Sequence, residues 1–240
     1  MLILGISTST QQAGCAVGGH EGVLALVQSA RGRRHAENLA PAIDMVRRQA
    51  AVDLREIGCI AVDVGPGLFT GLRVGVATAK ALAHALRVPM VGVNSLDLVA
   101  FPTRWSTRLI VAALDARRGE VFTASYRQVP GGIQRVSAPR VCSPTDLATE
   151  MLASREDVLL VGDGARRYAD DFEAVSHVEL ADQGAQYPSA ASLVQLAHAQ
   201  ALREEFVPHW ELEPVYLRAP DAAIDWVGHE ASAASRDATG

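Results

Sequence analysis

The chain has 240 residues, of which 49% are hydrophobic, and its formal net charge is −5. This length allows one large domain or two small lobes, and the apolar content is sufficient for a substantial core. The negative charge argues against a protein that grips nucleic acid with its own surface, because such binding needs a basic patch. Three widely spaced cysteines without a CxxC pair indicate neither a disulfide framework nor a cysteine zinc site. With no apolar run of membrane-spanning length, this composition predicts a cytoplasmic protein.

The first half of the chain predicts three strands joined by short turns, followed by alternating helices and strands. Strands are expected at Leu2–Ser7, Gly14–Val17, Val23–Ser29, Ile60–Val64 and Met90–Val93. Helices are expected from His35 to Ala50, from Thr70 to Leu86, and from a cap at Ser95 to Ala100. Pro41 lies inside the first of these helices and should bend it or delay its start.

The second half predicts a similar order of elements. Strands are expected at Leu109–Leu114, Val121–Tyr126, Val136–Cys142, Val158–Val161 and Val178–Leu180. Helices are expected from Pro144, after Gly162-Asp163-Gly164, and over Ser189–Leu202. In both halves, three hairpin-linked strands are extended by strands that need crossover helices. This duplication predicts an α/β fold of two lobes, each a mixed sheet flanked by helices.

We expect a first lobe over residues 1–105, a second over 106–218, and a disordered tail over 219–240, which is rich in Ala, Ser and Asp. A duplicated pattern of this kind resembles the actin-like (ASKHA, ribonuclease H-like) architecture of ATPases and sugar kinases. In that architecture an aspartate on the first hairpin organises magnesium and phosphates. Ser7 stands at this position here, and a neutral serine cannot hold Mg²⁺ as a carboxylate does.

The most informative stretch is the loop Gly65-Pro66-Gly67 and the helix that follows it. The loop residues tolerate unusual backbone angles, and the start of the helix offers free N–H groups to an anion. Within the helix, Gly71, Gly75, Ala79 and Ala83 recur at intervals of four. Two interior glycines cost about 2 kcal/mol relative to alanine. This ridge of small residues therefore predicts a second backbone packed closely against it.

The motifs of common catalytic and metal sites are missing. Arg73 follows the loop where a Walker A motif has Gly-Lys-Ser/Thr, and the glycine spacing does not fit a dinucleotide fingerprint. No histidines have the HxxxH spacing of a helical zinc site. Asp115 and Glu120 form a carboxylate pair only if they reach each other across the turn between them. Asp63 is expected either to contact a ligand or to cap a turn. We therefore assign no catalytic residue and no metal ligand.

With these residues in hand, the chain is similar to the TsaB (YeaZ) family. Its stretch Gly65-Pro66-Gly67-x-Phe69-Thr70-Gly71-x-Arg73-x-Gly75-x-Ala77-x-Ala79-Lys80 closely matches the hallmark of that family. Further matches are Arg34-His35, Val91-Gly92-Val93-x-Ser95-Leu96, Leu114-Asp115-Ala116-Arg117-x-Gly119-Glu120-Val121, Val161-Gly162-Asp163-Gly164 and Glu213-Pro214-Val215-Tyr216-Leu217-Arg218. Two positions depart from the pattern, because the family usually has aspartate where Ser7 stands and serine where Leu68 stands.

The resemblance implies a non-catalytic partner of a TsaD-like enzyme in threonylcarbamoylation of the tRNA adenosine adjacent to the anticodon. A TsaE-like ATPase would be a further partner, and tRNA would be engaged only through the complex. Whether the chain forms a homodimer when the enzyme is absent is left undecided. No cofactor is expected, although a nucleotide at the partner interface stays open. The alternatives are an actin-fold ATPase or small-molecule kinase, and a metallopeptidase-like hydrolase.

The resemblance places the partner interface on the helix after the glycine loop and on the helix before it. In the family, these two helices form a bundle with the matching pair of TsaD. The expected interface residues are His35, Leu39, Ile43, Thr70, Gly71, Val74, Gly75, Thr78, Ala79 and Leu82. A ligand loop is expected at Gly65, Pro66, Gly67 and Arg73. We expect Gly75→Leu to abolish pairing while leaving the chain folded.

Overall fold

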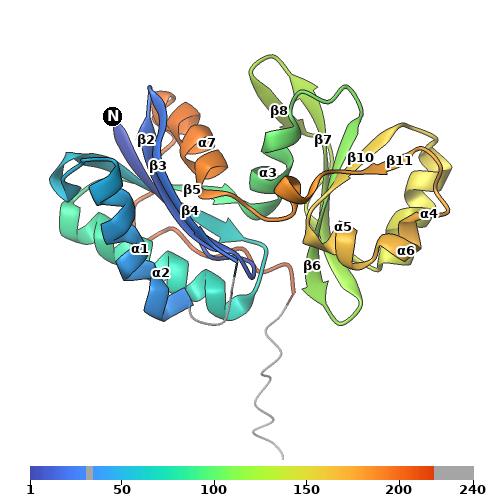
Figure 1. Cartoon of the computed structure of the whole chain (residues 1–240), viewed down its shortest axis with the longest axis horizontal. Coiled ribbons are helices and arrows are strands. Elements are labelled where there is room, and N and C mark those ends of the chain that lie inside the picture. Colours follow the sequence, from blue (N-terminus) through green and yellow to red (C-terminus); the bar gives the residue numbers. More distant parts are fainter. Residues whose placement is uncertain (31–34, 219–240) are drawn as a thin grey trace, which may run out of the picture.

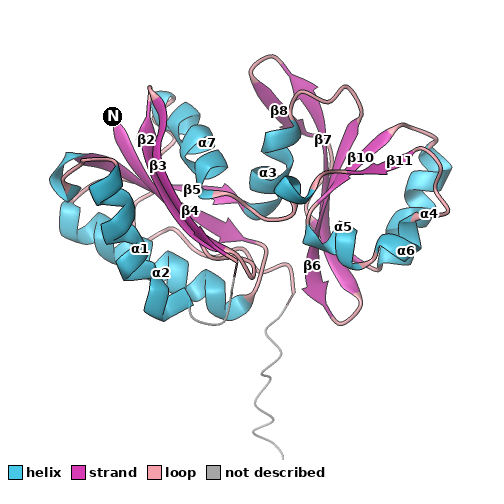
Figure 2. Ribbon diagram, in the orientation of Figure 1, coloured by secondary structure: helices cyan, strands magenta, loops and turns pink. Residues whose placement is uncertain are grey.

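The computed structural model describes residues 1–30 and 35–218, which form two lobes lying side by side (Figure 1). Each lobe is built on one β-sheet, and helices flank both sheets (Figure 2). Residues 31–34 and the expected tail over 219–240 lie outside the described residues.

The first lobe has a five-stranded sheet in the order β3-β2-β1-β4-β5. Its strands are β1 (Leu2–Ser7), β2 (Ala13–Gly19), β3 (Gly22–Ser29), β4 (Ile57–Gly65) and β5 (Met90–Asn94). The pairs β1–β2 and β2–β3 are antiparallel, whereas β1–β4 and β4–β5 are parallel. The helices of this half are α1 (His35–Gln49), η1 (Leu54–Glu56), α2 (Phe69–Leu86), α3 (Ser95–Ala100) and η2 (Phe101–Thr103).

The second lobe has a six-stranded sheet in the order β11-β10-β6-β7-β8, with β9 paired to β7 outside this path. Its strands are β6 (Leu109–Arg117), β7 (Glu120–Val129), β8 (Gly132–Arg135), β9 (Arg140–Cys142), β10 (Val158–Val161) and β11 (Val178–Leu180). The helices of this half are α4 (Pro144–Ser154), α5 (Asp163–Arg167), α6 (Ala169–Phe172), η3 (Gln183–Ala185) and α7 (Ala190–Leu202).

The two sheets have the same topology. The order β8-β7-β6-β10-β11 repeats β3-β2-β1-β4-β5, and in both sheets the first three strands are antiparallel while the last two join in parallel. Parallel neighbours need a crossover connection, which the helices between them supply. The predicted fold, a duplicated actin-like arrangement of two mixed sheets flanked by helices, is therefore confirmed.

The last helix of each half packs against the sheet of the other half. In α3, Leu96 and Val99 share a core with Ile110 of β6, whereas in α7 Leu193 shares a core with Ile3 of β1. The opposite face of the first sheet is covered by α1 and α2, and that of the second by α4, α5 and α6. The segment expected to form the second lobe thus contributes α7 to the first, and α3 and α7 lie between the sheets (Figure 1).

Helices on both faces explain why the central strands are apolar over most of their length. Neighbouring side chains of a strand point to opposite faces, so both must be hydrophobic when both faces are covered. Ile3 and Leu4 of β1 are at most 1% exposed, although they face different helices. The continuous hydrophobic runs of β1, β4 and β6 thus form the centre of the two cores.

One strand prediction and one helix-cap prediction are wrong. The third strand of the second half is β8, Gly132–Arg135, and within the predicted range Val136–Cys142 only β9 is a strand. The cap of α3 is Asn94, whose Oδ1 accepts a hydrogen bond of 2.9 Å from the Leu96 N–H. The Ser95 hydroxyl is engaged elsewhere, as described below.

The first helix is not delayed by its proline. It begins at His35 and continues through Pro41, which is exposed. The ring of Pro41 removes one backbone donor from the second turn, and tertiary packing of the apolar stripe of α1 compensates for this loss.

Candidate functional site

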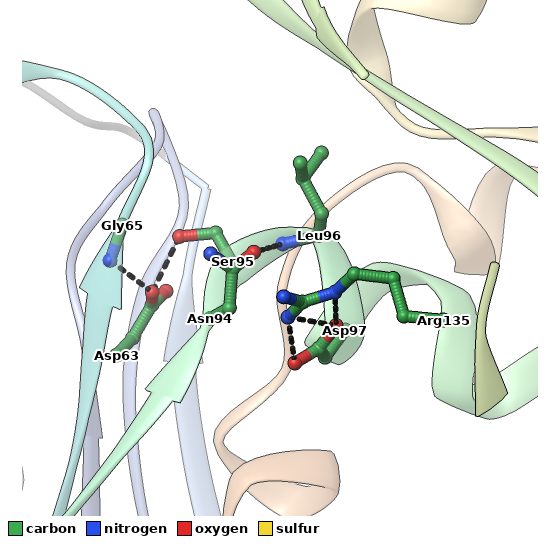
Figure 3. Close-up of polar contacts among 7 residues, drawn as sticks. All are labelled: Asp63, Gly65, Asn94, Ser95, Leu96, Asp97 and Arg135. Carbon is green, nitrogen blue, oxygen red and sulfur yellow. Dashed lines mark hydrogen bonds and ion pairs between the residues drawn. The ribbon is translucent and has the colours of Figure 1, made fainter. Parts of the chain in front are cut away.

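A fully buried aspartate lies where the glycine loop meets the first hairpin. Asp63 is 0% exposed, near the end of β4. Its Oδ2 accepts hydrogen bonds from the hydroxyls of Ser7 at 2.8 Å and Ser9 at 2.5 Å. Its Oδ1 accepts from the Ser95 hydroxyl at 2.5 Å and from the Gly65 N–H at 3.1 Å (Figure 3). Of the two roles left open for Asp63, these contacts support turn capping, because they occupy the carboxylate within the chain.

Burial raises the pKa of the Asp63 carboxyl, while the hydrogen bonds from Ser9, Ser95, Ser7 and the Gly65 N–H lower it. Ser7 has no carboxylate of its own, but its hydroxyl donates a hydrogen bond to the carboxylate of Asp63. Asp63 reaches from β4 to the side chain of Ser7 on β1, the position at which the family that the sequence resembles usually has an aspartate. The first lobe thus retains one acidic side chain here, but the carboxylate is sealed from solvent.

The glycine loop is shaped by close approach to the hairpin. A Cβ at Gly67 would fall well inside contact distance of the Ser9 carbonyl oxygen, and the next amide, Leu68 N–H, donates to that same oxygen at 2.6 Å. The Gly65–Pro66 peptide is cis, and Gly65 has a positive φ of 102°. Gly67 is therefore needed for packing of the loop on the hairpin. The start of α2 has Leu68 at its N-cap and no side-chain cap, whereas the serine usual in the family could accept a hydrogen bond there.

Part of the expected ligand loop lines a cavity between the lobes. Pro66 and Gly67 form one wall, and Asp115 and Arg117 of the second lobe form another. The C-terminal segment from Val215 to Arg218 lines the same cavity. It is fixed to the first lobe by a hydrogen bond of 2.7 Å from the Val215 N–H to the Val64 carbonyl. The remaining volume of about 140 Å³ is below the roughly 300–1,000 Å³ of typical small-molecule sites.

The other two residues of the expected ligand loop do not line this cavity. Gly65 is buried. Arg73 lies over the ring of Phe69, 3.8 Å from its centroid, and its Nε donates to the Tyr216 hydroxyl at 3.5 Å. The rings of Phe69 and Tyr216 are 5.2 Å apart. Arg73 thus takes part in an aromatic cluster that holds the C-terminal segment, a contact for which the sequence contains no local signal.

Two acidic residues of the second lobe, Asp115 and Glu120, are paired with arginines. An Asp115 carboxylate oxygen lies 3.2 Å from Arg117 and 3.6 Å from Arg167, while Glu120 accepts from Arg218 at 2.8 Å. Asp115 and Glu120 therefore do not form the carboxylate pair considered from the sequence. Asp163 accepts from the Asp115 N–H at 3.0 Å, and burial raises the pKa of its carboxyl. Among residues 1–30 and 35–218, no cluster of three or more His, Cys, Asp or Glu side chains could hold a metal ion.

We expect the isolated chain to bind Mg-ATP with a Kd weaker than about 1 mM, because the cavity is small and Asp63 is sealed. Isothermal titration calorimetry of the purified chain would measure this. Saturable binding in the micromolar range, with turnover, would support the ATPase or kinase alternative.

The small-residue ridge of α2 faces the chain's own sheet. Gly71, Gly75 and Ala79 are buried, and a Cβ at Gly75 would overlap the Thr8 Oγ1. The Thr8 hydroxyl donates to the Gly71 carbonyl at 2.7 Å. The close backbone partner predicted from the ridge is therefore the first hairpin of the same molecule. The assignment of Gly71, Gly75 and Ala79 to a partner interface is wrong for this reason.

Two interface residues predicted on α1 are also buried. Leu39 and Ile43 are 4% and 7% exposed and belong to the core formed with β1, β2 and β4. Burial in this core leaves them unavailable to a second chain, so their assignment to the interface is corrected as well. His35 begins α1, but its side chain lies outside what the structure describes.

The outward side of α2 carries a different row of small residues, here called the outer stripe. It consists of Thr70, Val74, Ala77, Ala81 and Ala85. Val74 is half-buried and the other four are exposed. Their spacing of three and four residues places them on one face of the helix. Two further predicted interface residues, Thr78 and Leu82, are half-buried beside this stripe. We did not predict the exposed alanines of this stripe, Ala77, Ala81 and Ala85, as interface residues. Alanines occur on both sides of α2, and composition does not tell which side faces the sheet.

Comparison with known proteins identifies close counterparts of this architecture. The family model TsaD, tRNA N6-adenosine threonylcarbamoyltransferase, matches residues 24–226. The tRNA threonylcarbamoyladenosine biosynthesis protein TsaB of Escherichia coli is 29% identical over 222 residues, covering 91% of this chain and 95% of the relative. YeaZ from Pseudomonas aeruginosa superimposes with a TM-score of 0.79 at 28% identity, covering 90% of this chain and 99% of that one.

A longer relative is also found. An uncharacterized protein of Mycobacterium leprae is 33% identical over 234 residues, covering 92% of this chain, and the chain spans 56% of that relative's length. No helix within residues 1–30 and 35–218 is long and apolar enough to cross a membrane. The family model covers most of the chain, and the similarity to TsaB and YeaZ proteins extends over both lobes. The chain therefore belongs to the TsaB (YeaZ) family of tRNA threonylcarbamoyladenosine biosynthesis proteins.

Proposed function

We propose that this chain is a non-catalytic subunit that binds and activates a TsaD-like enzyme, which threonylcarbamoylates the tRNA adenosine adjacent to the anticodon. A TsaE-like ATPase is the further protein partner. The tRNA is engaged only through the complex, since the chain has a net charge of −5. The assembly works in the cytoplasm.

The observation that carries this proposal is the outer stripe of α2. Exposed alanines at helical spacing let a second helix approach closely, as in coiled-coil-like helix pairs. Beside it, α1 exposes Pro41 and Met45, the latter 54% exposed. The two helices lie side by side along the outer edge of the first lobe (Figure 1). This face fits a helix pair of a partner, and the interface residues that we retain are Thr70, Val74, Thr78 and Leu82, with Ala77 and Ala81 added.

A non-catalytic role is supported by how the acidic side chains are used. Asp63 is sealed by four hydrogen bonds, and Asp115 and Glu120 contact arginines. Catalytic carboxylates must reach a substrate, whereas these bind groups of the same molecule. We therefore assign the catalytic residues of the reaction to the TsaD-like partner.

We expect the double variant Ala77→Arg/Ala81→Arg to stay folded but to bind the TsaD-like enzyme of its own organism about 100-fold more weakly. Both alanines are exposed, so the arginines are tolerated by the free chain, but in a helix–helix interface they are bulky and bury unpaired charge. Size-exclusion co-elution and surface plasmon resonance would measure the loss.

The matched control is Ala153→Arg, an exposed alanine of α4 in the second lobe, which should leave binding unchanged. Normal co-elution of the double variant would show that the outer stripe is not the interface. Failure of the unaltered chain to co-elute with the enzyme would contradict the proposed function itself. If the free chain forms a homodimer through the same stripe, the double variant becomes monomeric in light scattering.

A further inference from the structure

A groove of about 700 Å³ lies where the C-terminal end of α2 meets the segment that follows α7. Ala85, the last residue of the outer stripe, lines this groove. Val88 and Pro89 line it after the end of α2, and Phe206 and Trp210 line it from the segment after α7. A molecule that covers the outer stripe would therefore also reach this groove, here called the Trp210 groove.

Trp210 is an exposed aromatic side chain held in place by its neighbours. It is 67% exposed, although tryptophan is mostly buried in folded proteins. Its ring lies edge-on to that of His209, with 4.9 Å between the centroids, and His209 Nε2 lies 3.2 Å from His84 Nδ1 on α2. Tryptophan is enriched among the residues that dominate the binding energy of protein interfaces. A side chain that is already ordered also loses little entropy on binding.

The segment that carries Trp210 is fastened to the first lobe on both sides of that residue. Before it, Val207 and Met90 exchange two backbone hydrogen bonds, of 2.9 and 3.3 Å. After it, the Lys80 ammonium on α2 donates to the Leu212 carbonyl at 3.0 Å. The groove is thus preformed in the free chain.

The groove also carries a positive charge without a partner. Arg87 lines it, is exposed, and caps α2 in the left-handed conformation with φ 56°. Within residues 1–30 and 35–218, its guanidinium makes no hydrogen bond or ion pair. Among the described residues that line the groove, none is Asp or Glu. In a chain of net charge −5, this groove is a local site for a carboxylate, which guanidinium binds in two-pronged fashion.

We propose that the Trp210 groove is a second contact of the enzyme that covers the outer stripe. A segment of that enzyme places an apolar side chain against Trp210 and a carboxylate on Arg87. The inference rests on the proposed function, because a partner seated on the outer stripe is what brings such a segment to the groove. Apolar walls and one unpaired cation together select this combination.

The test is surface plasmon resonance of the full-length chain with the TsaD-like enzyme of its own organism. We expect Trp210→Ala to weaken binding about 30-fold and Arg87→Glu to weaken it about 10-fold. Binding of the unaltered chain should also weaken as salt is raised, and Arg87→Glu should reduce this salt dependence. Both side chains are exposed, so both variants should melt like the unaltered chain in circular dichroism.

The matched controls are Trp105→Ala and Arg155→Glu, which should bind normally. Trp105 is 69% exposed, Arg155 caps α4 with φ 55°, and neither lines the groove. The proposal is overturned if Trp210→Ala or Arg87→Glu binds as tightly as the unaltered chain, or if the controls weaken binding as much. Should these variants bind normally while Ala77→Arg/Ala81→Arg does not, the groove contact fails and the proposed function stands. Failure of the unaltered chain to bind would contradict the proposed function itself.

Discussion

Replacing Gly75 with leucine is expected to lower the free energy of unfolding by about 3–5 kcal/mol, a large fraction of the roughly 5–15 kcal/mol that keeps a domain folded. A Cβ at this position overlaps the Thr8 Oγ1, which is itself held by the hydrogen bond to the Gly71 carbonyl. The larger side chain must therefore push α2 away from the first hairpin and break that buried hydrogen bond. Urea denaturation followed by circular dichroism would measure the loss.

The matched control for this change is Ala77→Leu, two residues along the same helix but exposed, which should alter stability by less than about 0.5 kcal/mol. This result would reverse the expectation drawn from the sequence, in which Gly75→Leu disturbs pairing and leaves the chain folded. If Gly75→Leu denatures at the same urea concentration as the unaltered chain, the close packing of α2 on Thr8 is refuted.

Exchange of Ser7 and Asp63 is the second change with a large expected effect. Asp63→Ser alone leaves the buried hydroxyls of Ser9 and Ser95 and the Gly65 N–H without their carboxylate acceptor, at a cost of about 2–4 kcal/mol. Ser7→Asp alone places a second carboxylate against the first, because the Ser7 Oγ lies 2.8 Å from Asp63 Oδ2. The double variant Ser7→Asp/Asp63→Ser restores one carboxylate and one hydroxyl, and it should recover most of the lost stability.

Stability of the two single variants and the double variant forms a thermodynamic cycle, in which we expect a favourable coupling of about 1–3 kcal/mol. The Ser7→Asp variant should also respond to pH. A neighbouring like charge raises the pKa of the carboxyl pair in the folded state above its unfolded value. Its stability is therefore greatest at low pH and falls as the pH rises through that raised pKa. Additive losses in the double variant would show that Asp63 does not substitute for an acidic residue at position 7.

Much of the fold could be predicted because many strands and helices are indicated by local patterns, such as hydrophobic runs bounded by turn residues. The runs Leu2–Ser7 and Val158–Val161 are bounded by turn residues and become β1 and β10 as predicted. The weaker strand β8 was misplaced, because Gly132–Arg135 has no hydrophobic run and pairs at the edge of the sheet. β8 pairs with β7 across a tight turn at Gly131. The backbone of Gly131 has a positive φ, a conformation that glycine adopts readily.

The candidate site was harder to predict, because its contacts join distant parts of the chain. The ridge of Gly71 and Gly75 correctly predicts a close backbone neighbour, but the neighbour is Thr8 of the same molecule rather than a partner. Likewise, Asp63 meets Ser95 across 32 positions and Arg73 meets Tyr216 across 143. No periodicity in the sequence encodes such meetings, which are fixed only once both lobes are packed.

The placement of α7 on the first sheet has a consequence for synthesis on the ribosome. The final strand of that sheet ends at Asn94, but the helix that covers its inner face begins only at Ala190. At roughly 5–20 residues per second, translation leaves this interval open for roughly 5–20 s. Throughout it, Ile3, Ala61 and Val91 lack their cover in the nascent chain. Elongation intermediates that lack α7 therefore expose apolar surface that the finished molecule buries, and such surface favours aggregation.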